Sequence, residues 1–310
     1  MTGAFEHLMP VLGVIAVGWF IGRIGLIDAG GRAGVDRLAY FVLFPCLIVL
    51  TLSTAEFGAL PWQALGATLF LSVMTMAALC LCLYPVLSRR LGISGPSFTS
   101  VFQGSTRWNT FIALAISGSL FGATGLTLVA VAIVAMVPVL NLMAVIVLVR
   151  FSSSTRPPFL VLIREIARNP LIVACVIGLA LNLSGLVPVG PVKATLEIFG
   201  RAALAVALVA VGLGLDVNAL RRPKAAHVIG VGMRLIGMPL IGAVYAAAFG
   251  LSGDVLTIAV ISLAVPSAAN AYLLAKQLGG DADLMAELIT MQTIGAAITM
   301  PFWLAVLANI

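Results

Sequence analysis

The chain has 310 residues, of which 62% are hydrophobic and 9% are charged, and its formal net charge is +6. A soluble domain carries about 25% charged residues, so this composition excludes the soluble globular class and favours a protein whose solvent is the lipid bilayer. The two histidines and four cysteines form no metal-ligand pattern, and nucleotide-binding and G-x-S-x-G motifs are absent. We therefore predict no enzyme activity, no catalytic residue, no metal and no cofactor.

Uncharged runs long enough to cross a bilayer follow one another along the chain, since about 20 mostly apolar residues suffice for one crossing. The run 108–149 is too long for one span, and the segment FGATG (121–125) offers a hinge within it. We predict an all-α polytopic membrane protein with ten transmembrane helices. The remaining spans fall at 8–22, 38–55, 57–88, 91–106, 169–192, 192–215, 235–253, 255–275 and 288–310.

Basic residues occur in alternate connecting segments, which marks those segments as cytoplasmic and places both termini outside. A cytoplasmic linker, 151–168, separates a first five-helix repeat, 1–150, from a second, 169–310. An odd number of spans in each half predicts two inverted repeats. Because the charges are scattered over short loops, they favour no nucleic-acid partner. The basic residues of these loops are Arg23, Arg32, Arg37, Arg89, Arg90, Arg150, Arg156, Arg164, Arg168, Arg221, Arg222, Lys224 and Lys276.

Polar interruptions occur near the middle of two spans that hold corresponding places in the two halves. Span 4 contains QGSTRWNTFIALA (103–115), and span 9 contains VPSAANAYLLA (265–275). Pro266 lacks an N–H and clashes with the preceding turn, so it breaks span 9. A break creates half-helix ends, and an N-terminal end suits an anion. Paired interruptions of this kind are typical of a transport site at the bilayer midplane.

Arg107 lies between two long uncharged runs, so it is within a span, where arginine usually lines a pathway. Its guanidinium suits a bidentate contact with a substrate carboxylate. The alternative is that Arg107 pairs with Glu287 or with freed carbonyls and only holds span 4 in place. For Asn109 and Asn270 the alternative is a structural hydrogen bond between helices. The predicted substrate-binding residues are Ser105, Arg107, Asn109, Thr110, Pro266, Ser267 and Asn270.

Three further polar residues in the second half are candidates for coupling or gating. Each also has a purely structural interpretation. Arg234 would snorkel or pair, Glu287 would be a solvated charge at a helix end, and Gln292 would hydrogen-bond within the core. Glu197 and Arg201 are four residues apart and are expected to pair on one helix face.

The segments QGSTRWNTFIALA, PSAANAYLLAKQLGGDADL and TMPFWLAVL resemble the bacterial branch of the auxin efflux carrier family, in the bile acid/arsenite/riboflavin transporter superfamily. The resemblance covers the whole chain in order. It implies a scaffold of spans 1, 2, 6 and 7, a transport domain of spans 3–5 and 8–10, and broken spans 4 and 9 that cross at the midplane. Pro266 takes the place of the span-9 crossover proline. Span 4 lacks the proline that the family often has, so we expect a gentler break opened by Gly104 and by the polar segment Ser105–Asn109.

The resemblance also implies transport of small organic anions by elevator motion, a homodimer formed through the scaffold, and residence in the bacterial inner membrane. Our leading hypothesis is a secondary transporter of carboxylates, including auxin-like ones, whose partners are the anion, membrane lipid and a second copy. The alternative is a proton- or sodium-driven exchanger of the same architecture without an organic substrate. The crossing segments carry no acidic residue, which argues against a cation exchanger.

Overall fold

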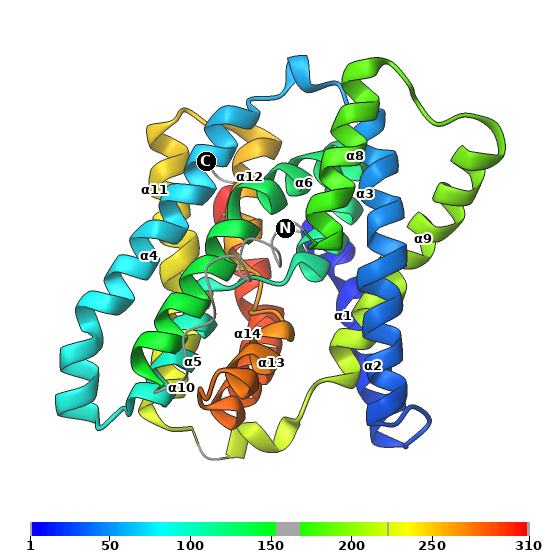
Figure 1. Cartoon of the computed structure of the whole chain (residues 1–310). Helices are drawn as coiled ribbons and strands as arrows, with labels where there is room; N and C mark the ends of the chain where they lie inside the picture. Colours follow the sequence, from blue (N-terminus) through cyan, green and yellow to red (C-terminus); the bar gives the residue numbers. More distant parts are fainter. Residues whose placement is uncertain (1, 153–167, 222, 309–310) are drawn as a thin grey trace. The chain divides into compact units, whose positions relative to one another are not determined.

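The computed structural model describes residues 2–152, 168–221 and 223–308, and these residues form helices and connecting loops without a strand (Figure 1). Among them, six helical segments are long and apolar enough to cross a membrane, and three shorter apolar helices accompany them. The all-α prediction is confirmed, whereas the count of ten spans and the inverted repeats stay predictions. Most of the predicted linker 151–168 lies outside the described residues, as do Arg156, Arg164 and Arg222.

The helices of the first half are separated by short loops and include two irregular turns, one π-helical (η1) and one 3-10 (η2). They are α1 (Thr2–Arg23), α2 (Ala29–Leu38), η1 (Ala39–Leu43), α3 (Phe44–Ser53), η2 (Phe57–Ala59), α4 (Trp62–Leu91), α5 (Gly95–Thr106) and α6 (Thr110–Phe151). The helices of the second half include the 3-10 turn η3 and the π-helical turn η4. They are α8 (Pro170–Ser184), α9 (Gly190–Leu213), η3 (Val217–Arg221), α10 (Ala225–Gly232), η4 (Met233–Gly237), α11 (Met238–Ala248), α12 (Gly253–Ala264), α13 (Asn270–Gln277) and α14 (Ala282–Leu307).

The chain divides into two compact units, and each takes segments from both halves of the sequence. The first unit comprises Met1–Trp62, Thr110–Val134 and Leu160–Leu215, and the second comprises Gln63–Asn109, Ala135–Phe159 and Asp216–Ile310. The first unit thus contains the segments expected for the scaffold, and the second contains most of those expected for the transport domain. One segment departs from that expectation, because the first part of α6 belongs to the first unit.

The first unit is held together by close helix contacts at glycine. A Cβ at Gly18 would lie 2.3 Å from the carbonyl oxygen of Val209, and one at Gly212 would lie 2.1 Å from that of Ile15. The α1 and α9 backbones therefore touch where side chains are absent, a packing mode common between membrane helices. Helix α3 runs beside α8 (Figure 1), and Asn182 donates to the carbonyl oxygens of Ser53 and Ala55.

Two local predictions of the sequence are confirmed. Within α6 the backbone leaves the helical region at Gly122 (φ 55°, ψ −136°), inside the FGATG hinge. A positive φ of this size suits glycine because it has no Cβ. The carboxylate of Glu197 lies 3.5 Å from the guanidinium of Arg201, and Lys193 joins the pair at 3.9 Å.

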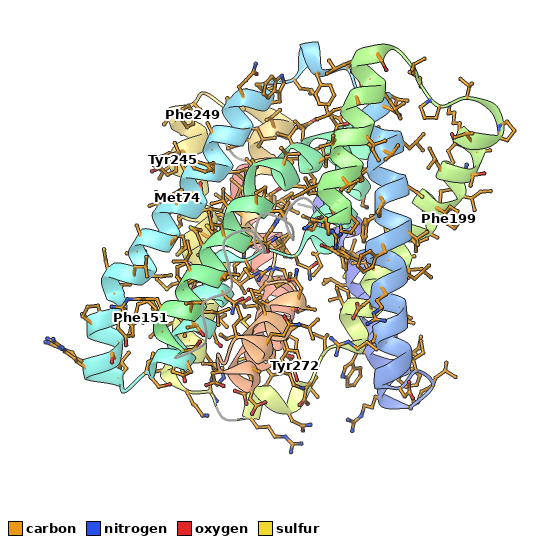
Figure 2. All side chains as sticks on the ribbon, viewed as in Figure 1. Met74, Phe151, Phe199, Tyr245, Phe249 and Tyr272 are labelled. Atoms are coloured by element: carbon orange, nitrogen blue, oxygen red, sulfur yellow. The ribbon has the colours of Figure 1, made fainter. Side chains whose placement is uncertain are left out.

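One end of the second unit is fastened around Asp281. This residue caps α14 by accepting from the N–H of Leu284 at 3.0 Å, and its other carboxylate oxygen accepts from Ser97 at 2.8 Å. Its backbone carbonyl accepts from Ser100 at 2.6 Å. The start of α5 and the start of α14 are therefore joined. Phe151, labelled in Figure 2, packs edge-on against Tyr84 and Phe98 in the same unit.

The same unit contains a hydrogen bond between α4 and α11. The hydroxyl of Tyr245, also labelled in Figure 2, lies 2.8 Å from Oγ1 of Thr75. The hydrogen bonds of Asp281 and of Tyr245 thus join helices of the second unit, the unit in which α5 and α12 end.

Candidate functional site

Both interruptions predicted from the sequence are breaks in the second unit, and their geometries match. Helices α5 and α12 each have 12 residues and begin with a Ser-Gly pair. Each ends at a residue in extended conformation, Arg107 (φ −70°, ψ 149°) and Val265 (φ −64°, ψ 150°). The two breaks therefore begin with the same backbone geometry, although the span-4 interruption (107–109) is shorter than the span-9 interruption (265–269). Gly104, the residue expected to open the span-4 break, lies inside α5.

The two break segments bind each other directly. The N–H of Asn109 donates to the carbonyl oxygen of Pro266 at 2.8 Å. The hydroxyl of Ser267 donates to the carbonyl oxygen of Gly104 at 2.7 Å. A broken membrane helix must have its freed backbone groups satisfied by protein, water or ligand, and here each break satisfies part of the other.

Arg234 binds the ends of both half-helices. It lies in the π-helical turn η4 and is fully buried. Its Nε donates to the carbonyl oxygen of Val265 at 2.6 Å, and its Nη1 donates to that of Thr106 at 3.3 Å. The C-terminal end of a helix carries about −0.5 charge, so one guanidinium compensates the negative ends of α5 and α12 together. Of the two structural interpretations of Arg234, snorkelling is wrong because the side chain is fully buried, and it instead pairs with backbone carbonyls; its coupling or gating role stays a prediction.

Gln292 is the second side chain that holds the crossing. Its Nε2 donates to the carbonyl oxygens of Gly104 at 2.9 Å and Gly230 at 3.0 Å, while its Oε1 accepts from the N–H of Ser267 at 3.0 Å. A side-chain amide is used here as both donor and acceptor. Gln292 therefore ties α14 to α5, to α10 and to the break after α12.

Arg107 is buried, and its guanidinium is directed to neutral oxygens. Nη2 donates to Oδ1 of Asn141 at 2.7 Å, and Nη1 to Oε1 of Gln103 at 3.3 Å. The interpretation that Arg107 pairs with Glu287 is not what the structure shows. The carboxylate of Glu287 instead lies 2.7 Å from Nε2 of His227, and Glu287 is a partly exposed charge near the start of α14.

The remaining predicted site residues take different positions around the crossing. The hydroxyl of Ser105 bonds back to the carbonyl of Val101 at 2.8 Å within α5. Pro266 is buried in the break, and Asn270 is the exposed first residue of α13. Asn109 is buried in the second unit, whereas Thr110 begins α6 and belongs to the first unit. The structure therefore brings Ser105, Arg107, Asn109, Pro266, Ser267 and Asn270 into one unit and leaves Thr110 in the other.

Several buried polar groups at the crossing have hydrogen-bond partners, and others do not. Four backbone carbonyls of the break region already accept hydrogen bonds: those of Gly104, Thr106, Val265 and Pro266. By contrast, three buried side-chain N–H groups have no acceptor within the described part of the chain. They are Nε2 of Gln103, Nε1 of Trp108 and Nη2 of Arg234.

Buried polar groups without a partner are uncommon and call for an explanation, such as a ligand or ordered water. All three of these N–H groups are donors, and the hydroxyl of Ser262 in α12 is also buried without a partner among the described residues. Gln103 and Trp108 were not predicted as site residues. The only sequence signal for them was their position inside the polar stretch QGSTRWNT.

This chain is similar to known membrane transport proteins along nearly its whole length. The sequence model of a family described as "Membrane transport protein" matches residues 3–304. An "Uncharacterized transporter" of Methanothermobacter thermautotrophicus is 24% identical over 306 residues, which cover 98% of this chain and 99% of that protein.

Two rice proteins match over shorter stretches. "Probable auxin efflux carrier component 5c" of Oryza sativa subsp. japonica is 29% identical over 124 residues, 36% of this chain and 32% of its own length. "Probable auxin efflux carrier component 5b" of the same plant is 25% identical over 138 residues, 43% of this chain and 38% of its own length.

Proposed function

We propose that this chain, which belongs to the membrane transport protein family and is a multi-pass membrane transporter, carries small organic anions, and that the anion binds at the crossing of the two breaks. The family and the names of the relatives indicate a transporter and not an enzyme. The substrate class is a carboxylate, which includes auxin-like acids. The support for this class comes from the crossing itself.

The observation that carries the proposal is the group of buried N–H donors without an acceptor in the described part of the chain. Three N–H groups lack acceptors within the described residues, on Gln103, Trp108 and Arg234. Two of the side chains at the crossing, Arg107 and Arg234, are cationic. A ligand that supplies acceptor oxygens and a negative charge would satisfy both needs. The exposed Asn270 at the N-terminal end of α13 adds an accessible donor beside a positive helix end.

The alternative of a sodium- or proton-driven exchanger without an organic substrate has less support. Segments 103–109 and 264–270 contain no acidic residue. The carbonyl oxygens of Thr106 and Val265, which are hard ligands suited to a metal cation, accept from Arg234 instead. A fixed guanidinium thus occupies the place where a cation would find its ligands.

The two-unit organisation supports alternating access by movement of one unit against the other. Each unit combines segments from both halves of the chain, and the crossing lies within the second unit. This unit is the candidate for the moving elevator, and the first unit is the candidate scaffold through which two copies would associate. The location proposed for this assembly is the bacterial inner membrane, with both termini outside.

The test is uptake of labelled malate, malonate and indole-3-acetate by proteoliposomes that contain the purified protein. We expect transport of at least one of these anions, and a loss of about tenfold or more in the variants Arg107→Ala and Asn270→Ala. Arg201→Ala is the matched control, because its side chain is 81% exposed and lies in the first unit. If both crossing variants transport like the unaltered protein, the proposed site is wrong.

A further inference from the structure

The second unit contains a buried histidine that the anion site does not use. His227 is 1% exposed and lies in the first turn of α10. Its Nδ1 accepts from the backbone N–H of Lys224 at 2.8 Å, and its Nε2 lies 2.7 Å from Oε2 of Glu287. Because Nδ1 faces a donor, the proton of the neutral imidazole is on Nε2, which donates to the carboxylate.

This arrangement has two consequences for a proton. The neutral imidazole and the ionised carboxylate carry one negative charge together, and uptake of one proton makes the pair neutral overall. A proton taken up by the imidazole goes to Nδ1, and two donors then face each other. The hydrogen bond from Lys224 must break, and the first turn of α10 loses its cap. Glu287 is 37% exposed, so its carboxylate gives the buried imidazole a route to solvent.

The pair lies on the two helices that hold the crossing. Helix α10 continues into η4, where Arg234 follows His227 by about two turns and binds the ends of α5 and α12. Helix α14 carries Gln292 beyond Glu287, and Gln292 binds Gly104, Gly230 and Ser267. A rearrangement of the first turn of α10 therefore takes place about two turns from Arg234, on a helix that continues to the crossing.

The charged groups on the elements that pack against α10 have other partners or are exposed. Helices α5 and α14 and the turn η4 pack against α10; α5 carries no charged residue, and η4 carries only Arg234. On α14 the oxygens of Asp281 accept from Leu284 and Ser97. The remaining charged groups at this end are exposed: Asp216, Arg221, Lys224 and Asp283.

We propose that His227 and Glu287 form a proton-binding latch between α10 and α14. Proton uptake breaks the hydrogen bond from the N–H of Lys224 and releases the first turn of α10, while the bond from Nε2 to the carboxylate becomes charge-assisted and holds. Histidine is the side chain whose charge changes between about pH 5 and pH 8. As a coupling site for the transport cycle, the pair rests on the proposed function. As a proton-sensitive contact between two helices, it stands on the geometry alone.

The test is hydrogen–deuterium exchange of the purified full-length protein at pH 8 and pH 5.5, corrected for the intrinsic pH dependence of exchange. We expect the peptide that covers α10 to lose about fivefold or more of its protection at pH 5.5. His227→Gln should show no such change, and Glu287→Gln should show a smaller one, because it keeps a hydrogen-bond acceptor but loses the charge that attracts the proton. His7→Gln, which alters the only other histidine of the chain, should behave like the unaltered protein.

The proposal is overturned if α10 protection in the unaltered protein is the same at both pH values, or if His227→Gln keeps the full change. If His227→Gln does not fold, Glu287→Gln serves as the test instead. A pH-dependent loss of α10 protection in Glu287→Gln as large as in the unaltered protein then also overturns the proposal. Carboxylate uptake at the two pH values separates this inference from the proposed function. A histidine-dependent change in exchange without transport of any carboxylate would reject the function alone, and pH-independent exchange with active transport would reject the latch alone.

Discussion

Replacement of Arg234 by alanine should destabilise the protein through the two breaks. The guanidinium satisfies the buried carbonyl oxygens of Val265 and Thr106, and a buried acceptor left without a partner costs about 1–3 kcal/mol. Two such acceptors give a loss of about 2–6 kcal/mol in the free energy of unfolding. At about 2–4 °C per kcal/mol for a protein of 150–250 residues, the midpoint of thermal unfolding should fall by at least about 4 °C.

The assay is thermal unfolding of the purified protein in detergent, with two companion variants. Arg234→Lys keeps the charge but lacks the planar fork that reaches two carbonyls, so its midpoint should lie between those of the alanine variant and the unaltered protein. Arg201→Ala removes an exposed ion pair, worth about 0.2–1 kcal/mol, and should lower the midpoint by no more than about 4 °C. If Arg234→Ala is no less stable than Arg201→Ala, the reasoning that this side chain holds both half-helix ends is refuted.

Three further substitutions, two of them with a companion variant, test contacts within the two units. Gly230→Ala places a Cβ 2.7 Å from Cδ2 of Leu288 and should cost about 1–3 kcal/mol in the free energy of unfolding. In a double-mutant cycle with Leu288→Ala the two costs should be less than additive, and an absence of coupling would contradict the contact. Gly212→Ala places a Cβ 2.1 Å from a backbone oxygen and should lower the unfolding midpoint by several degrees, whereas Gly13→Ala, with no atom within 4 Å, should be neutral or slightly stabilising. Asp281→Ala removes the N-cap of α14, which should lower the free energy of unfolding by about 0.5–2 kcal/mol and speed hydrogen exchange in the first turn of α14. Unchanged exchange would contradict the capping role of Asp281.

Local features of both units were accessible from the sequence because each has a local cause. Pro266 and the polar stretch around Arg107 interrupt apolar spans, and both interruptions are breaks in the structure. The hinge at Gly122 follows from a glycine in a run too long for one crossing. The pairing of Glu197 with Arg201 follows from helical spacing.

The missed features depend on contacts between residues far apart in the chain. His227 and Glu287 are 60 residues apart, and nothing in the spacing of either residue points to the other. The role of Arg234 depends on the π-helical turn that directs its guanidinium to two separate helix ends. The division into units that mix both halves of the chain has the same origin, since it is a property of packing and not of any segment.

Gln292 illustrates the difference between composition and geometry. From the sequence it is one polar residue in an apolar span, for which core hydrogen bonding and a coupling role are both reasonable. The structure gives it three partners on α5, on α10 and in the break after α12. Its identity was visible in the sequence, but its position between the two breaks was not.

The central claim is that buried donors at the crossing bind a carboxylate, and the most direct measurement is equilibrium binding by calorimetry. Malate, malonate and indole-3-acetate are each compared with the corresponding neutral amide, using the unaltered protein, Trp108→Phe and the control Trp19→Phe. The account predicts that one carboxylate binds while its amide does not, and that Trp108→Phe, which removes a single unpartnered donor, weakens binding by up to about tenfold. Equal affinity for acid and amide, or binding to Trp108→Phe as tight as to the unaltered protein, would contradict it.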